Sequence, residues 1–157
     1  MSYSHTQRGP IWVMLAVLSL AAFTGAWGAR GEMPLAVALV GLGVLMVVLA
    51  LSFATLTVRD DGDSLAIRFG PLPMFRKRIA YGVITSAEAS RSALIDGWGI
   101  HYIPGRGWTY NLWGWTCVQL RVNGRTIRVG SDDAENLARF LGTKIRGAGM
   151  AGARNHA

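Results

Sequence analysis

The chain has 157 residues and a formal net charge of +7, and 51% of its residues are hydrophobic. This length suits one small domain plus a membrane segment. The single cysteine, Cys117, excludes a disulfide within the chain and a metal site built from thiolates. The three histidines, His5, His101 and His156, lie far apart in the sequence and give no support to a metal site.

Charged residues are concentrated in the second part of the chain. The only charged residues among the first 55 are Arg8, Arg30 and Glu32. Within this part, two uncharged apolar runs cover residues 10–29 and 34–54. A helix crosses the bilayer core of about 30 Å with about 20 residues, so each run predicts a membrane-spanning helix.

The short connection between the two runs makes the helices antiparallel neighbours. We therefore predict an N-terminal tail over residues 1–9 and a transmembrane hairpin over residues 10–54. Small residues indicate where the two helices approach each other closely. These are Ala21, Gly25 and Ala29 on the first helix and Gly41 and Gly43 on the second.

The charges that flank the hairpin predict its orientation. Arg30 lies in the connection, whereas Arg59, Arg68 and the basic run 76–78 follow the second helix. Positive charge collects on the cytoplasmic side of membrane proteins. We therefore expect a multi-pass protein of the inner (plasma) membrane with both termini in the cytoplasm. The alternative is a cleaved signal peptide, which Trp27 and the length of the uncharged run disfavour.

From residue 55 the apolar residues recur at every second position, which predicts strands. Residues 56–59 and 65–69 are predicted to pair across the acidic segment 60–63. We interpret this segment as a turn, because it lacks the ligand spacing of a calcium-binding loop. Two further strands are predicted over residues 74–79 and 83–91.

Two more hairpins follow in the sequence. The first joins residues 99–103 to 107–111 through a Pro-Gly turn, in which glycine accepts the positive φ of a type II turn. The second joins residues 118–122 to 127–129 through Asn123-Gly124, the strongest two-residue hairpin signal.

A C-terminal helix is predicted after the last hairpin. Asp132 and Glu135 have the spacing of a capping box, and apolar residues then repeat on one helical face. Gly142 is expected to end the regular helix. We place the β domain with its helix at residues 55–145 and a flexible Gly/Ala-rich tail at 146–157.

The segment from residue 96 to 115 is unusually rich in aromatic residues. The sequence leaves three interpretations open: the rings fill a small barrel, lie at the membrane interface, or form a binding surface for peptide, lipid or nucleic acid. Nucleic acid is disfavoured, because Arg106 is the only basic residue among the rings. The candidate interaction surface consists of Trp98, His101, Tyr102, Arg106, Trp108 and Tyr110.

Arg76, Lys77 and Arg78 form a basic run on a predicted strand. Consecutive strand residues point to opposite faces, so all three cannot reach one phosphate unless the strand lies at an edge. Two interpretations follow. The run is a contact for anionic lipid headgroups, or it is a solvated edge that resists aggregation.

In its order of elements the chain resembles the bacterial pleckstrin-homology-like (bPH) membrane proteins. The segments that carry this resemblance are LTVRDDGDSLAIRFGP at 56–71, RKRIAYGVITSAEA at 76–89, GWGIHYIPGRGW at 97–108 and VNGRTIRVGSDDAENLARFL at 122–141. The resemblance implies an α+β membrane protein in which the two-helix hairpin precedes a PH-like antiparallel split β-barrel of about seven strands. The last helix would close one end of that barrel. No ligand residue is carried over, because the loop at 60–63 is acidic.

These features predict a membrane protein that presents a cytosolic, non-enzymatic interaction domain, acting as a tether or scaffold for an unknown protein partner. The first alternative is a domain that senses anionic lipid through the basic run 76–78. The second is an enzyme, which would require His101 to lie close to Asp96 or Glu88. No catalytic residues, cofactor, metal or nucleic-acid partner is predicted, and the oligomeric state is left open.

Overall fold

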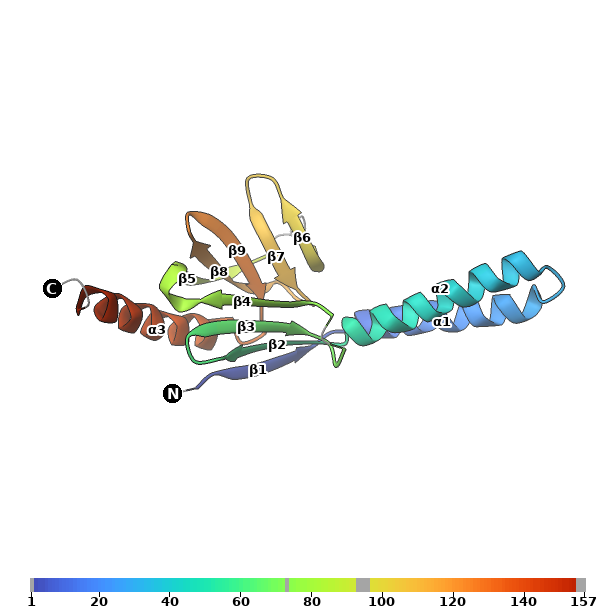
Figure 1. Ribbon diagram of the computed structural model, residues 1–157, viewed down its shortest axis with the longest axis horizontal. Helices are drawn as coiled ribbons and strands as arrows, with labels where there is room; N and C mark the ends of the chain where they lie inside the picture. The colour runs from blue at the N-terminus through green and yellow to red at the C-terminus, as the bar shows by residue number, and fades with distance from the viewer. Residues whose placement is uncertain (1, 73, 93–96, 155–157) are drawn as a thin grey trace.

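The computed structural model describes residues 2–72, 74–92 and 97–154, and Figure 1 shows an α+β protein with a long helical hairpin at one end. The helices and strands follow one another as β1 (Ser4–Arg8), α1 (Ile11–Gly28), α2 (Met33–Ser52), β2 (Thr55–Asp60), β3 (Ser64–Phe69), β4 (Arg76–Ala80), the 3-10 turn η1 (Tyr81–Val83), β5 (Ile84–Arg91), β6 (Gly99–Ile103), β7 (Gly107–Asn111), β8 (Thr116–Val122), β9 (Arg125–Gly130) and α3 (Ala134–Arg154).

The two apolar runs form α1 and α2, which lie side by side and project away from the strands (Figure 1). By length and composition, each helix is able to cross a membrane. The buried residues of α1 are Ser19, Ala22 and Ala26 rather than the predicted Ala21 and Ala29, whereas the predicted Gly25 does face α2, because a Cβ built on it would lie 3.4 Å from Leu39. The Ser19 hydroxyl donates to the carbonyl of Gly43 at 3.0 Å. The predicted contact at Gly41 is also wrong, because a Cβ built there meets nothing within 4 Å.

The N-terminal residues that we predicted to be a tail form a strand. β1 pairs antiparallel with β2, with Arg8 opposite Thr55 and Ser4 opposite Arg59. The α1–α2 hairpin is therefore inserted between two paired strands, and both of its ends belong to one sheet. Sequence reasoning missed β1 because the residues in SHTQR are all polar and show no apolar alternation.

The strands form two sheets, with the orders β1-β2-β3-β4 and β5-β8-β9-β7-β6. The described residues contain nine strands where about seven were predicted, and neither sheet closes into a barrel. One pair, β7 with β9, is parallel, so the prediction of a wholly antiparallel barrel is wrong there. The core between the sheets includes Leu65, Ile67, Val118 and Leu120, which are fully buried.

The C-terminal helix α3 differs from its prediction at both ends. It starts at Ala134, and Asp132 contacts His5 of β1 instead of capping the helix. It then continues to Arg154, through Gly142 and through most of the predicted flexible tail; residues 155–157 lie outside the described part. A glycine costs a helix only about 1 kcal/mol relative to alanine, and the fully buried Leu137 and Leu141 hold α3 against the strands.

Candidate functional site

The predicted aromatic hairpin is present with the predicted strand limits. β6 and β7 pair antiparallel, with Gly99 opposite Asn111 and Ile103 opposite Gly107. The amide of Arg106 donates to the carbonyl of Ile103 at 3.0 Å, and Gly105 has a φ of 77°, as the type II turn requires.

The candidate interaction surface is divided between the two faces of this sheet. Tyr102 lies opposite Trp108 on β6–β7, and Trp108 and Tyr110 are neighbours of the core residues Ile127 and Val129 on β9. These three rings therefore belong to the inner face, where Trp108 lies 5.6 Å from Tyr102 and 6.2 Å from Tyr110 between ring centroids. His101 alternates with them and belongs to the outer face.

Trp98 belongs to a separate group of rings. Its ring centroid lies 4.2 Å from that of Trp113 and 6.3 Å from that of Trp115. A Cβ at Gly9, two residues before α1, would lie 3.0 Å from the Cβ of Trp113. The three rings are 37–45% exposed, so they do not fill the space between the sheets. We call Trp98, Trp113 and Trp115 the tryptophan cluster.

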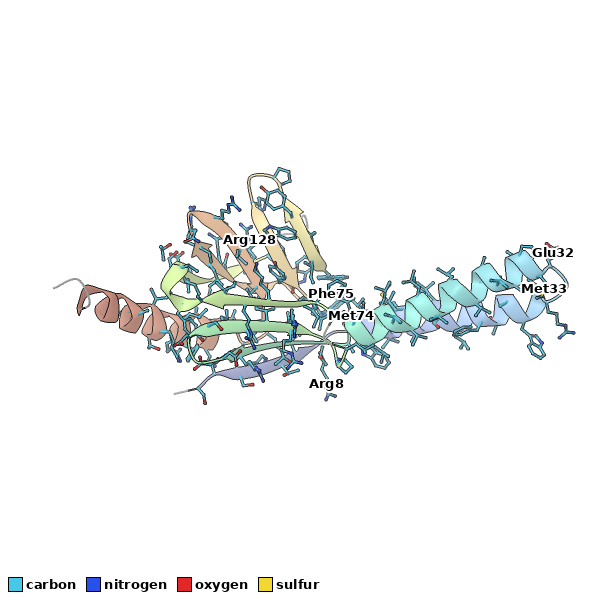
Figure 2. The ribbon with its side chains drawn as sticks, in the orientation of Figure 1. Arg8, Glu32, Met33, Met74, Phe75 and Arg128 are labelled. Carbon is cyan, nitrogen blue, oxygen red and sulfur yellow. The ribbon has the colours of Figure 1, made fainter. Side chains whose placement is uncertain are left out.

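A second exposed apolar group lies beside the other helix of the hairpin. Met74 and Phe75, on the loop that leads into β4, lie where α2 meets the strands (Figure 2). The Ser52 hydroxyl lies 3.5 Å from the Met74 sulfur, and the Phe53 and Phe75 ring centroids are 5.4 Å apart. Met74 is 60% exposed, and Leu72 in the same loop is also exposed. We call Leu72, Met74 and Phe75 the loop cluster.

Both clusters therefore surround the end of the hairpin that joins the sheet. Neither Trp113 nor the loop cluster belongs to the surface predicted from sequence. What identifies these residues is their closeness to a helix end, and this closeness arises only on folding. In sequence, Trp113 is about a hundred residues away from Gly9.

The basic run 76–78 alternates as predicted. Lys77 pairs with the core residue Ile67, so its side chain belongs to the inner face, whereas Arg76 and Arg78 belong to the outer face. Arg76 lies opposite Arg68, and Arg78 donates to Asp61 at 2.9 Å. The outer face of the first sheet carries all five arginines of its strands: Arg8, Arg59, Arg68, Arg76 and Arg78.

A groove of about 290 Å³ runs between β4 and the aromatic hairpin, on the open side of the two sheets. Its lining includes apolar residues from both sheets, among them Phe75, Ile100 and Tyr110, and the cationic Lys77 at its rim. Burial raises the pKa of the Tyr110 hydroxyl, so this part of the groove wall is partly removed from water.

The acidic segment 60–63 is a turn, as predicted, and the carboxylates of Asp60 and Asp61 are engaged. Asp60 accepts from Lys144 of α3 at 2.8 Å and from the Tyr81 hydroxyl at 2.8 Å. Burial alone would raise the pKa of Asp60, but these hydrogen bonds outweigh burial and lower it. Among the described residues no group of three or more acidic, histidine or cysteine side chains is placed to hold a metal ion.

Of the two predicted acidic partners of His101, Glu88 is described by the structure and does not lie close to it. Glu88 lies on β5 and His101 on β6, and these strands form the two opposite edges of one sheet. Four strand spacings of about 4.8 Å each separate such edges by about 19 Å. Asp96, the other predicted partner, lies outside the described residues.

Comparison with known proteins adds no identification. No protein-family model and no curated protein matches this chain. The resemblance to the bPH proteins therefore stays a prediction, and the function has to be argued from the site.

Proposed function

We propose that the α1–α2 hairpin spans a membrane and holds the β domain against the bilayer surface, where the domain acts as a non-enzymatic tether for a partner. The observation that carries this proposal is the pairing of β1 with β2. Both helix ends continue into one sheet within three residues, so no flexible linker separates hairpin and domain. Holding a domain in this way raises its effective concentration for partners at the same surface.

The side chains of the hairpin support the membrane assignment. Most of its large apolar residues are exposed, including Leu20, Trp27 and Val37 at 64–74%. A core helix of a soluble protein would bury such residues. A cleaved signal peptide is also disfavoured, because cleavage after α1 would remove β1 from its sheet.

The two exposed apolar clusters fit the membrane interface. Tryptophan rings favour the level of the lipid headgroups, and the tryptophan cluster lies beside the start of α1. The loop cluster lies beside the end of α2. In this arrangement the hairpin base is flanked on both sides by residues that the headgroup region accommodates.

The proposal includes the finer predictions from sequence. The arginines flanking the hairpin favour the inner membrane with both termini in the cytoplasm, and β1 and the domain lie at the same end of the hairpin (Figure 1). Two packed sheets followed by a helix agree with a PH-like domain of the bPH type. The parallel β7–β9 pair and the added β1 strand are features of this chain.

Extraction and topology mapping test the proposal. The full chain expressed in bacteria should stay in the membrane pellet at alkaline pH. A fluorescent protein fused to the C-terminus should fluoresce, whereas alkaline phosphatase at the same position should be inactive. Release of the chain by alkaline washing, or a size shorter than the full chain, would overturn the proposal.

A second candidate function, contact with anionic lipid, is favoured by the register of the first sheet. Arg8 lies opposite Thr55, at the end of β2 that adjoins α2, and Arg68 and Arg76 lie one row further from the hairpin. Arg59 and Arg78 lie in the next row, and each row of two residues adds about 6.6 Å. The surface potential of anionic lipid falls off within a Debye length of about 8 Å, so the first rows experience it most strongly.

This candidate predicts a graded response to charge removal. In nanodiscs that contain phosphatidylglycerol, amide hydrogen exchange in β1 and β4 should slow at low salt and recover at high salt. Arg8→Gln should weaken this protection more than Arg76→Gln, and Arg76→Gln more than Arg78→Gln. Protection that ignores salt, or that responds equally to all three variants, would reject the candidate.

A further inference from the structure

We propose that the groove between β4 and the β6–β7 hairpin binds one acyl chain of an anionic lipid, with the lipid headgroup at Lys77. This inference rests on the proposed membrane anchoring, and it assigns a ligand to a site separate from the arginine face. The groove lies on the inner side of the sheets, whereas the arginines lie on the outer side.

The groove has the chemistry of a site for an apolar chain. Its floor is formed by Ile67 and Phe69 of β3, which are fully buried, and its far wall by Ile100 and Tyr110. The volume of about 290 Å³ lies at the lower limit of the range found for small-ligand pockets. The raised pKa of Tyr110, caused by burial, agrees with a wall that is partly removed from water.

The position of the groove indicates which molecule can enter it. Met74 and Phe75 line the groove and also touch the end of α2, through the Ser52–Met74 and Phe53–Phe75 contacts. If α2 spans the bilayer, this end of the groove opens at the headgroup level. A lipid chain can then enter from the membrane without crossing water.

The charge at the rim selects the headgroup. Lys77 is exposed and belongs to the inner face of β4, which faces the groove. A second cavity continues the groove along β4, and it too is lined by Lys77 together with Trp108 and Arg125. A phosphate placed at Lys77 would therefore contact the ammonium group of Lys77, with Arg125 in the lining of the adjoining cavity, and an acyl chain would extend from it over Phe75 and Ile100.

Photo-crosslinking of the full chain in nanodiscs tests this site. The probe is phosphatidylglycerol that carries a diazirine on one acyl chain, and the cross-linked peptides are identified by mass spectrometry. We expect cross-links in β6 and β7 besides those in α1 and α2. Phosphatidylcholine with the same diazirine chain should label α1 and α2 equally and the groove less.

Matched variants separate the groove from the arginine face. Lys77→Gln should lower the groove cross-links about fivefold, whereas Arg68→Gln, which removes the same charge from the outer face, should leave them unchanged. Ile100→Trp should fill the groove and abolish them. If Ile100→Trp does not fold, free lauroyl phosphatidylglycerol added as a competitor should reduce the same cross-links.

The outcomes distinguish a failure of the proposed acyl-chain site from a failure of the proposed membrane anchoring. Cross-links in α1 and α2 with none in β6 or β7, or groove cross-links that are insensitive to Lys77→Gln, would overturn the acyl-chain site alone. An absence of cross-links in α1 and α2 would overturn the membrane anchoring itself. A co-purified peptide that protects the β4 amides, without groove cross-links, would overturn the lipid assignment in favour of a protein strand.

Discussion

The two sheets of this protein have different relations to the helical hairpin. The first sheet contains both strands that continue from the helices, β1 and β2, and its outer face carries arginines. The second sheet approaches the hairpin through the loop after β7, where Trp113 lies against Gly9 and its carbonyl accepts a hydrogen bond from Gln7, and this sheet and its loops carry four of the six tryptophans. The difference suggests that the first sheet fixes the position of the domain and that the second presents surfaces to lipid or to a partner.

The largest expected effect concerns the junction of the first sheet with α2. Gly70 has a φ of 62°, and a Cβ there would fall on the backbone carbonyls of Leu51 and Ser52. We expect Gly70→Ala to cost about 3 kcal/mol or more of unfolding free energy, because backbone atoms cannot move aside. The control is Gly62→Ala, where φ is 77° but the space is open, which should cost about 1–2 kcal/mol.

Urea unfolding of both variants in detergent micelles measures the difference. Equal losses for the two substitutions would mean that the helix–sheet junction is loose enough to adapt. The proposed rigid connection between hairpin and domain would then be contradicted.

A smaller effect is expected from the contact between β1 and α3. The Tyr3 hydroxyl donates to Asp133 at 3.1 Å, and the Tyr3 ring stacks on Phe140 with centroids 5.4 Å apart. Tyr3→Ala should cost about 2–3 kcal/mol, and Tyr3→Phe about 1 kcal/mol. On the second sheet, Tyr102→Ala should cost less than about 1 kcal/mol, since Tyr102 is 57% exposed.

Thermal unfolding followed by circular dichroism gives the three values. If Tyr102→Ala proves as destabilising as Tyr3→Ala, the aromatic hairpin is structural. Its role as a binding surface would then lose its support.

The two groups of rings on the second sheet should differ in their contact with lipid. Trp113 lies beside the start of α1, whereas Tyr102 lies next to the turn of the β6–β7 hairpin, remote from the helices (Figure 1). In nanodiscs, a charged thiol reagent should modify Tyr102→Cys several-fold faster than Trp113→Cys, because the headgroup region slows its approach. The buried Cys117 of the unaltered chain should stay unmodified and gives the background rate. Equal rates at the two positions would contradict the interfacial placement of the tryptophan cluster.

Sequence reasoning succeeded where the signal is local. The turns at Asp61-Gly62, Pro104-Gly105 and Asn123-Gly124 depend on residues that tolerate positive φ, and all three are present. The strand β1 was missed because its pairing with β2 depends on a contact across the whole hairpin. No periodicity within five polar residues reports such a partner.

The candidate site was predicted only in part for the same reason. Alternation along β4 correctly separated Lys77 from Arg76 and Arg78. The sequence grouped Trp98 with Tyr102, whereas the fold places the Trp98 ring beside those of Trp113 and Trp115. Which face of a strand meets the groove depends on how two sheets pack, and this packing is not encoded within either strand.

The smallest effect tests the link between the first sheet and α3 through charge. The lowered pKa of Asp60 means that its carboxylate stabilises the fold at pH values above the unfolded pKa of about 4, and that this contribution is lost as the pH falls through the folded pKa. Lys144→Met should therefore cost about 1 kcal/mol at neutral pH and progressively less in acid. The control Lys77→Met, on the exposed edge of β4, should show no such pH dependence.

Unfolding free energies measured from neutral pH down to acid distinguish two roles for Lys144. Its ammonium group also lies 5.2 Å from the ring centroid of Tyr81 and 5.5 Å from that of Phe140. A loss that is constant across the pH range would assign the stabilisation to these rings, since their attraction for the cation does not require an ionised Asp60. A loss that disappears in acid assigns it to the carboxylate, and the turn between β2 and β3 is then fixed to α3 by an ion pair.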